Sequence, residues 1–212
     1  MSVAIIDFGA GNLRSAQKAF EHAIAAAGRA EEVIITADPA VVARADRVVL
    51  PGDGAFADCK RNLLAIPGMI EAIDETIDVR GRPFLGICVG MQLLATRGVE
   101  HAITAGLDRI PGEVRAVKPD DPALKVPHMG WNQLRLTERK CPLFKGLSDL
   151  QSVYFCHSYY PAAGDRGIMA AMTKYGIDFP SVIRQGQVFA TQFHPEKSQK
   201  AGLKILENFV DI

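Results

Sequence analysis

Short runs of consecutive apolar residues recur through the first half of the chain. Four of them lie at residues 3–7, 33–35, 48–50 and 83–87. Runs of this length and composition are typical of strands that are buried on both faces of a sheet.

Amphipathic stretches separate these runs. Apolar residues recur at spacings of three and four between Leu13 and Ala27, a helical pattern that Asn12 can cap and Gly28 can end. A helix-rich stretch continues to about Val79, and another helix is expected to start in the run 91–95. Strands that alternate with helices predict a mostly parallel central sheet with helices on both faces.

The second half has a different pattern, in which Pro, Gly and Asp separate strand-like segments. These segments are 114–117, 134–136, 153–155, 168–172, 182–184 and 188–192. A hairpin is expected at 182–192, with its turn at Gln185 and Gly186. An amphipathic helix is expected at 199–210, with Ser198 as its N-cap. The fold class is therefore α/β, with a mixed or antiparallel C-terminal part.

Composition adds limits to this picture. Hydrophobic residues make up 48% of the 212 positions, and 24 Lys and Arg balance 24 Asp and Glu. A neutral chain gives no electrostatic reason to expect nucleic acid or an anionic membrane as a partner. Asp7 interrupts the first apolar run, and no run approaches the roughly 20 residues of a spanning helix. We expect a soluble, cytoplasmic protein with one domain over 1–212.

The four cysteines are expected to be free. They are Cys59, Cys88, Cys141 and Cys156. No two of them have CxxC spacing, which argues against a zinc site, and nothing indicates secretion, which argues against disulfides.

Cys88 lies in Gly86-Ile87-Cys88-Val89-Gly90, where a predicted strand meets a predicted helix. This is the setting of a nucleophile elbow, in which glycines relieve crowding at a strained turn. N–H groups at the start of the helix favour a thiolate and can face an oxyanion. A small buried core residue is the alternative, and the motif alone does not decide between the two.

His194 and Glu196 provide a candidate base and its partner. They stand two positions apart at the end of a predicted strand, where an extended backbone would direct both side chains to one side and Pro195 would stiffen the turn. A histidine can take the thiol proton, and a carboxylate can hold the other ring nitrogen. Alone, the pair fits a surface turn. Together with the Cys88 motif, it favours a Cys–His–Glu triad.

Pro51-Gly52-Asp53-Gly54 follows the third predicted strand. Backbone N–H groups at glycines can approach a ligand closely, so a donor here and another after Cys88 would form an oxyanion hole. Considered alone, the segment is explained more simply as a strand-to-helix turn.

In this order, PGxG, GxCxG and HPE resemble the class I (triad) glutamine amidotransferases over essentially the whole chain. Segments 7–15, 127–132, 154–159 and 197–198 resemble more specifically the glutaminase subunits of imidazole glycerol phosphate synthase, an enzyme of histidine biosynthesis. The resemblance implies a flavodoxin-like fold, no metal or organic cofactor, and a heterodimer with a HisF-type (β/α)8 cyclase subunit. Ammonia from L-glutamine would pass to that subunit, which makes imidazole glycerol phosphate and an aminoimidazole carboxamide ribotide. The partner's ligand would control hydrolysis allosterically.

The resemblance also implies individual roles. The triad would be Cys88, His194 and Glu196. The oxyanion region would use the backbones of Gly52 and Val89. Glutamine would contact Gln92, Ser158 and Tyr159. The side facing the cyclase would carry Met129, Trp131, Asn132, Tyr154 and Lys197. Without the resemblance, Trp131 is expected in the core, and Tyr154 and Tyr159 on a half-buried strand. His157 is expected to be structural.

Asp53 departs from the pattern, because these subunits more often carry a small apolar residue there. A carboxylate aimed at the oxyanion would oppose catalysis, so alternation along the strand could instead direct it to a nearby cation. Three other functions remain open: the glutaminase subunit of another amidotransferase, a cysteine peptidase or other hydrolase, and an inactive partner-binding subunit.

Overall fold

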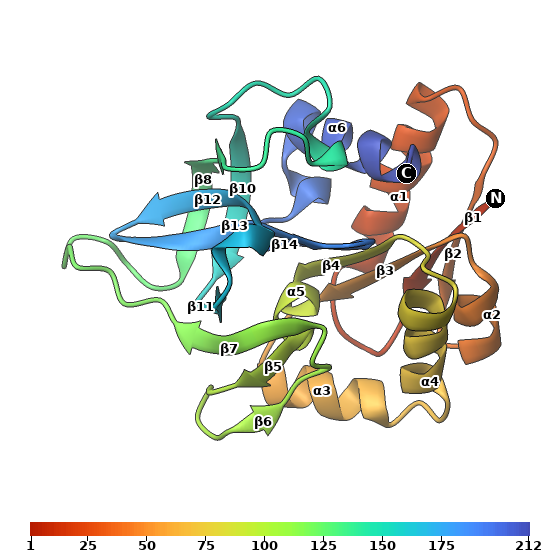
Figure 1. Cartoon of the computed structure of the whole chain (residues 1–212), viewed down its shortest axis with the longest axis horizontal. Helices are drawn as coiled ribbons and strands as arrows, with labels where there is room; N and C mark the ends of the chain where they lie inside the picture. Colours follow the sequence, from red (N-terminus) through yellow and green to blue (C-terminus); the bar gives the residue numbers. More distant parts are fainter.

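One large mixed sheet runs through the middle of the molecule (Figure 1), whose computed structural model describes all 212 residues. Five neighbouring strands are parallel: β2 (Glu32–Thr36), β1 (Ser2–Ile6), β3 (Arg47–Gly52), β4 (Phe84–Cys88) and β14 (Val188–Thr191). The sheet continues antiparallel through β13 (Ile177–Gln185), β12 (Met169–Tyr175) and β9 (Arg135–Leu136). This mixture of parallel and antiparallel parts confirms the predicted fold class.

Helices cover both faces of the parallel part. α1 (Leu13–Ala26) and α6 (Gln199–Val210) lie on one side, and α2 (Pro39–Arg44), α3 (Phe56–Leu64) and α4 (Met69–Asp74) on the other (Figure 1). A π-helical turn, η1 (Glu75–Val79), follows α4, and a short helix, α5 (Val89–Leu93), follows β4. Three 3₁₀ turns complete the helical segments: η2 (Pro142–Phe144), η3 (Arg166–Ile168) and η4 (Pro195–Lys197).

Two smaller sheets flank the central one. The first pairs β8 (His128–Gln133) with β10 (Ser152–His157). The second has the order β11 (Tyr159–Ala163), β7 (Ile110–Ala116), β5 (Ala95–Gly98) and β6 (Thr104–Ala105). None of the helices is long and apolar enough to cross a membrane.

Both long helices were predicted with nearly correct bounds. Asn12 caps α1 by accepting a hydrogen bond from the Ser15 N–H, and Gly28 follows the helix with a left-handed φ of +68°. The bounds of α6 are those predicted, and Ser198 occupies the N-cap position, but its side chain does not cap the helix. The Ser198 hydroxyl makes no cap hydrogen bond; it donates to the His194 carbonyl over 2.6 Å and accepts from the Tyr154 N–H over 2.9 Å.

The predicted helix starting at 91–95 is wrong beyond Leu93. α5 ends there, and the chain enters β5, where Ala95 pairs with Ile110 of β7. An unbroken apolar run has no period that separates a buried helix from a buried strand, so the sequence pattern did not contain this boundary. The strands β5, β6 and β8 were not predicted, and of β11 only Tyr159 was expected on a strand. The hairpin of β13 and β14 was predicted, with Gly186 at φ +60° in its turn.

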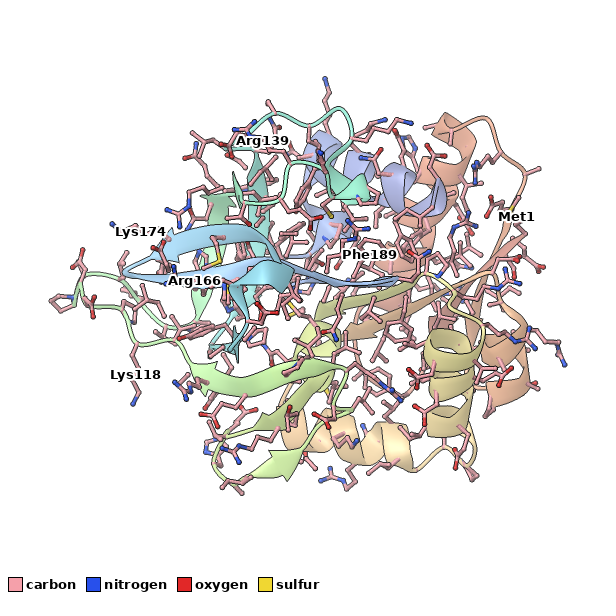
Figure 2. All side chains as sticks on the ribbon, viewed as in Figure 1. Met1, Lys118, Arg139, Arg166, Lys174 and Phe189 are labelled. Carbon is pink, nitrogen blue, oxygen red and sulfur yellow. The ribbon has the colours of Figure 1, made fainter.

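The core lies around the parallel strands. Phe189 of β14 is fully buried, whereas Lys118, Arg139 and Lys174 lie at the periphery (Figure 2). Because β3, β4 and β14 are neighbouring parallel strands, their carboxyl ends meet at one edge of the sheet. Gly52 lies opposite Cys88 there, and Gln192 and His194 follow the end of β14.

Candidate active site

Cys88 occupies a strained turn between β4 and α5. Its φ of +56° and ψ of −112° lie in a region that L-residues rarely adopt, and such backbone strain costs about 1–3 kcal/mol. The turn ends β4 and starts α5 at the next residue, Val89. The elbow predicted from the glycine pattern is therefore present, and its sulfur lies at the carboxyl edge of the sheet.

Three glycines allow β3, β4 and α5 to approach closely at this elbow. A Cβ added to Gly90 would lie 1.8 Å from the Leu50 carbonyl oxygen. One added to Gly86 would lie 2.8 Å from the Gly90 carbonyl oxygen, and one added to Gly52 would lie 2.7 Å from the Gly90 nitrogen. These contacts are with backbone atoms, which cannot rotate away, so the glycines are required for packing.

His194 and Glu196 are joined by a hydrogen bond. The Nδ1 of His194 lies 2.8 Å from Oε1 of Glu196, and both side chains are almost completely buried. The expected geometry is present for a different physical reason from the one predicted. Residues 195–197 form the 3₁₀ turn η4 and not an extended strand, and this turn brings the carboxylate back to the ring. The second carboxylate oxygen, Oε2, is buried without a partner, so Glu196 acts mainly on His194.

The surroundings of His194 favour its protonated form. Burial lowers the pKa of the imidazolium, but interactions with the Cys88 sulfur and the Glu196 carboxylate, including their negative charges, raise it to about 10. An imidazolium beside a thiolate is the ion pair that a cysteine nucleophile needs. The structure therefore brings together the three residues that were predicted to form the triad.

Gln192 also reaches the nucleophile, and the sequence reasoning missed it. Its Nε2 lies 3.8 Å from the Cys88 sulfur, and its Oε1 accepts a hydrogen bond of 3.2 Å from Gln92. The sulfur lies 3.8 Å from the Cys156 carbonyl oxygen as well. The position of Gln192, two residues before His194 and just after a strand next to β4, was the only signal available.

A pocket with a volume of about 210 Å³ opens beside Cys88. One water molecule needs about 10–15 Å³ in the same measure, so this volume is large enough for a small organic molecule such as an amino acid. Its lining includes the predicted residues Gln92, Ser158, Tyr159 and Val89. Glu100, which the sequence reasoning also missed, lines the same pocket and accepts a hydrogen bond from the Phe56 N–H over 2.8 Å.

The Pro51–Gly54 segment continues from β3 into the pocket. Gly52 is buried opposite Cys88, and Gly54 has a φ of +100°. Asp53 is exposed, lines the pocket and makes no ion pair, so the suggestion that a nearby cation holds its carboxylate is wrong. Its backbone carbonyl accepts a hydrogen bond from the Cys59 thiol over 3.3 Å. A backbone hydrogen bond thus ties this segment to α3, while the Asp53 side chain is exposed.

The predicted partner side lies on the sheet of β8 and β10. Met129 is 62% exposed and Trp131 49% exposed, so Trp131 is not a core residue. The Trp131 and Tyr154 rings meet edge to face with centroids 6.0 Å apart, and Lys197 is exposed. Asn132 differs, because its side-chain amide is held within this chain: it donates to the Lys174 carbonyl over 3.0 Å and lies 3.3 Å from Nε2 of His128.

His157 belongs to a buried pair and contacts no carboxylate. Its Nε2 lies 3.0 Å from Nδ1 of His128, and its Nδ1 lies 2.9 Å from the Tyr159 carbonyl oxygen. Burial lowers the pKa of His128 to about 4 and that of His157 to about 3. This neutral pair supports the structural role expected for His157.

The histidine pair predicts a loss of stability in acid. The unfolded chain takes up protons near its ordinary pKa of 6.5, whereas the folded pair resists them until about pH 4, so stability falls as the pH drops from 6.5 towards 4. Between pH 7.5 and 5, the wild type should lose roughly 1–2 kcal/mol more than His128→Gln. Urea unfolding at both pH values measures this, and equal losses in the two proteins would contradict it.

Comparisons with known proteins agree with this geometry. A family model described as "Glutamine amidotransferase class-I" matches residues 4–212. "Imidazole glycerol phosphate synthase subunit HisH" from Rhodospirillum rubrum is 51% identical over 210 residues, covering 99% of this chain and 98% of that protein. The protein of the same description from Rhodopseudomonas palustris is 50% identical over 216 residues, with the same coverage.

Solved structures share the fold at low sequence identity. A structure described as glutamine amidotransferase has a TM-score of 0.72 at 18% identity and covers 99% of this chain and 97% of its own. Another glutamine amidotransferase, from Thermotoga maritima, has a TM-score of 0.66 at 18% identity, covering 100% of this chain and 83% of its own.

Proposed function

Because the chain belongs to the class I glutamine amidotransferase family, we propose that it hydrolyses L-glutamine to glutamate and ammonia at Cys88. The observation that carries this proposal is the arrangement at the sheet edge. A cysteine on a strained elbow faces a buried His–Glu pair hydrogen-bonded over 2.8 Å, beside a pocket of amino-acid size. All of residues 1–212 contribute to one such unit in this proposal.

The chemistry begins with transfer of the thiol proton to the imidazole. His194 removes the Cys88 thiol proton, or already holds it in an ion pair, and the thiolate attacks the side-chain amide carbon of glutamine. Backbone N–H groups at Gly52 and Val89 stabilise the oxyanion. His194 then gives its proton to the departing ammonia, which leaves a thioester on Cys88. A water molecule, deprotonated by His194, attacks the thioester and releases glutamate. Glu196 keeps the ring oriented throughout.

The pocket lining suggests how glutamine is held. The amide nitrogen of Gln92 already donates to the Tyr159 carbonyl over 2.9 Å and to Gln192 over 3.2 Å. Its carbonyl oxygen therefore remains available as an acceptor for the substrate α-ammonium, and Glu100 adds a negative charge on the same lining. Ser158 and Tyr159, which also line the pocket, would contact the α-carboxylate of glutamine.

We further propose that the chain is the glutaminase subunit of imidazole glycerol phosphate synthase and works with a HisF-type cyclase subunit. Relatives of that description are about half identical over nearly the whole chain. Exposed apolar side chains on and beside β8 support a docking surface, since exposed apolar patches mark interaction sites. Met129 and Trp131 are exposed on β8, the exposed Val126 precedes this strand, and the exposed Leu150 lines a pocket together with Trp131. Tyr154 and Lys197 belong to the same surface, and Asn132 would contribute through its backbone.

Glutamine hydrolysis measured with and without the partner tests the proposal. The chain should co-purify with a cyclase subunit of this kind, and the cyclase's ligand should accelerate glutamate release. Trp131→Ala should weaken the complex.

Three other outcomes would favour the alternative functions. Peptide cleavage without ammonia release would indicate another hydrolase. Failure of a glutamine analogue to label Cys88 in the assembled complex would indicate an inactive subunit. Binding to a different synthase would identify another amidotransferase.

Asp53→Val should leave glutamine hydrolysis within about threefold of the wild type. The Asp53 carboxylate is exposed and unpaired, so its removal alters neither a buried contact nor the triad. Its backbone carbonyl still receives the Cys59 thiol. The check is kcat and KM for glutamine in the complex. A loss comparable to that of Cys88→Ala would assign Asp53 a direct part in the reaction.

A further inference from the structure

A buried amide, that of Gln192, lies between the Cys88 sulfur and the pocket residue Gln92. Gln192 is completely buried just beyond the end of β14, which runs parallel to β4, and its backbone N–H donates to the Ser181 carbonyl over 3.0 Å. The side chain has no access to water. Its polar atoms are therefore satisfied by the protein, or they remain unpaired at a cost.

Both ends of this amide have partners in the site. Oε1 accepts from Gln92 Nε2 over 3.2 Å, and Nε2 points to the Cys88 sulfur at 3.8 Å. Gln92 donates in turn to the Tyr159 carbonyl over 2.9 Å. One continuous set of hydrogen bonds therefore joins the reacting sulfur to the wall of the pocket.

We propose that Gln192 is a further catalytic residue, whose amide N–H donates a hydrogen bond to the Cys88 thiolate while its carbonyl holds Gln92 in place for glutamine. This role rests on the proposed glutaminase function. A side-chain amide neither gains nor loses a proton near neutral pH, so it leaves proton transfer to His194. A donor to an anion forms a charge-assisted hydrogen bond, which stabilises the thiolate more than the thiol.

The orientation of the amide supports this direction of donation. Gln92 can only donate from Nε2, so the atom of Gln192 that it meets must be the carbonyl oxygen. The nitrogen of Gln192 is thereby left facing the sulfur. Reversing the amide would oppose the NH₂ groups of Gln92 and Gln192, and would add a second carbonyl oxygen to that of Cys156 beside the sulfur.

Two substitutions separate a catalytic role from a packing role. Gln192→Leu keeps most of the volume and removes both hydrogen bonds. Gln192→Glu keeps an acceptor for Gln92 and replaces the donor by a carboxylate oxygen next to the sulfur. The matched control is Asn208→Leu, because Asn208 is an equally buried amide that donates to the Leu143 and Lys145 carbonyls, away from the pocket.

Alkylation of Cys88 by iodoacetamide, followed across pH by mass spectrometry of its peptide, reports the thiolate directly. In Gln192→Leu the rate at pH 7 should fall about tenfold, and in Gln192→Glu by more. In the assembled enzyme, kcat should fall about tenfold in Gln192→Leu and by more in Gln192→Glu, and KM should rise more in Gln192→Leu than in Gln192→Glu. Asn208→Leu should lower the melting temperature and leave the alkylation profile unchanged.

Wild-type alkylation profiles in both Gln192 variants, with kcat within twofold, would overturn the proposal. Should a variant fail to fold, the wild type still decides. The side-chain amide signal of Gln192 in a ¹H–¹⁵N spectrum should shift along the Cys88 titration curve, and a signal that does not respond would exclude the contact. Alkylation needs no glutamine, so absence of glutamine hydrolysis in the wild type would count against the proposed function alone.

Discussion

Cys88→Ala should reduce glutamine hydrolysis by about 10⁴-fold or more, since loss of a nucleophile leaves only the contributions of binding and of the oxyanion donors. Alanine keeps the Cβ and loses only the sulfur, so the elbow retains its positive φ and its packing. The assay is glutamate release by the assembled enzyme at saturating glutamine.

Two controls make this result specific. Cys141→Ala changes a cysteine that is equally buried but does not line the pocket, so hydrolysis should persist. If the proposed pairing with a cyclase is correct, added ammonium should restore product formation to the Cys88→Ala complex, because only the source of ammonia is missing. Hydrolysis by Cys88→Ala near the wild-type rate would remove Cys88 from the mechanism.

Gly90→Ala should be the most destabilising small substitution at the site. Its new methyl group would lie 1.8 Å from the Leu50 carbonyl oxygen, which belongs to a fully buried strand. Neither β3 nor α5 can move without disturbing the pairing of Gly52 with Cys88. We expect a loss of about 4 kcal/mol or more, a large part of the 5–15 kcal/mol that is typical of a folded domain.

Urea unfolding of Gly90→Ala and Gly164→Ala checks this expectation. Gly164 has open space around the position of an added Cβ and no positive φ, so Gly164→Ala should unfold within about 0.5 kcal/mol of the wild type. Similar stabilities for the two variants would mean that β3 and α5 can separate at little cost, contrary to their close approach in the structure.

The parts of the fold that were predictable have strong local signals. The helix at 13–26 has period, cap and terminating glycine, and the helix at 199–210 has a clear apolar face. Strands such as β8 and β11 lack such signals. β8 buries its histidine and exposes its methionine and tryptophan, and β11 contains a proline and is only partly buried. Their pairing depends on distant segments, which a local pattern does not specify.

The residues of the site also differ in how far the sequence could identify them. Cys88, His194 and Glu196 carry their chemistry in residue type and spacing, so they could be named from the sequence. Gln192 and Glu100 could not, because an amide or a carboxylate becomes informative only when burial and distance show what it faces. The hydrogen bond from the Asn132 amide to the Lys174 carbonyl could not be predicted either, nor could that from the Ser198 hydroxyl to the His194 carbonyl. Both depend on how distant or turned segments meet in the fold.

The strand order means that the large sheet and the active site can be completed only late in synthesis of the chain. β14 is the last strand in the chain, yet it lies in the interior of the sheet between β4 and β13. A ribosome that has released only the first two-thirds of the polypeptide has delivered the nucleophile but neither its base nor the strand that shields the edge of β4. A chain that ends before Val188 lacks His194 and Glu196, so it could not carry out the proposed hydrolysis, and it would leave one edge of the apolar strand β4 open to aggregation.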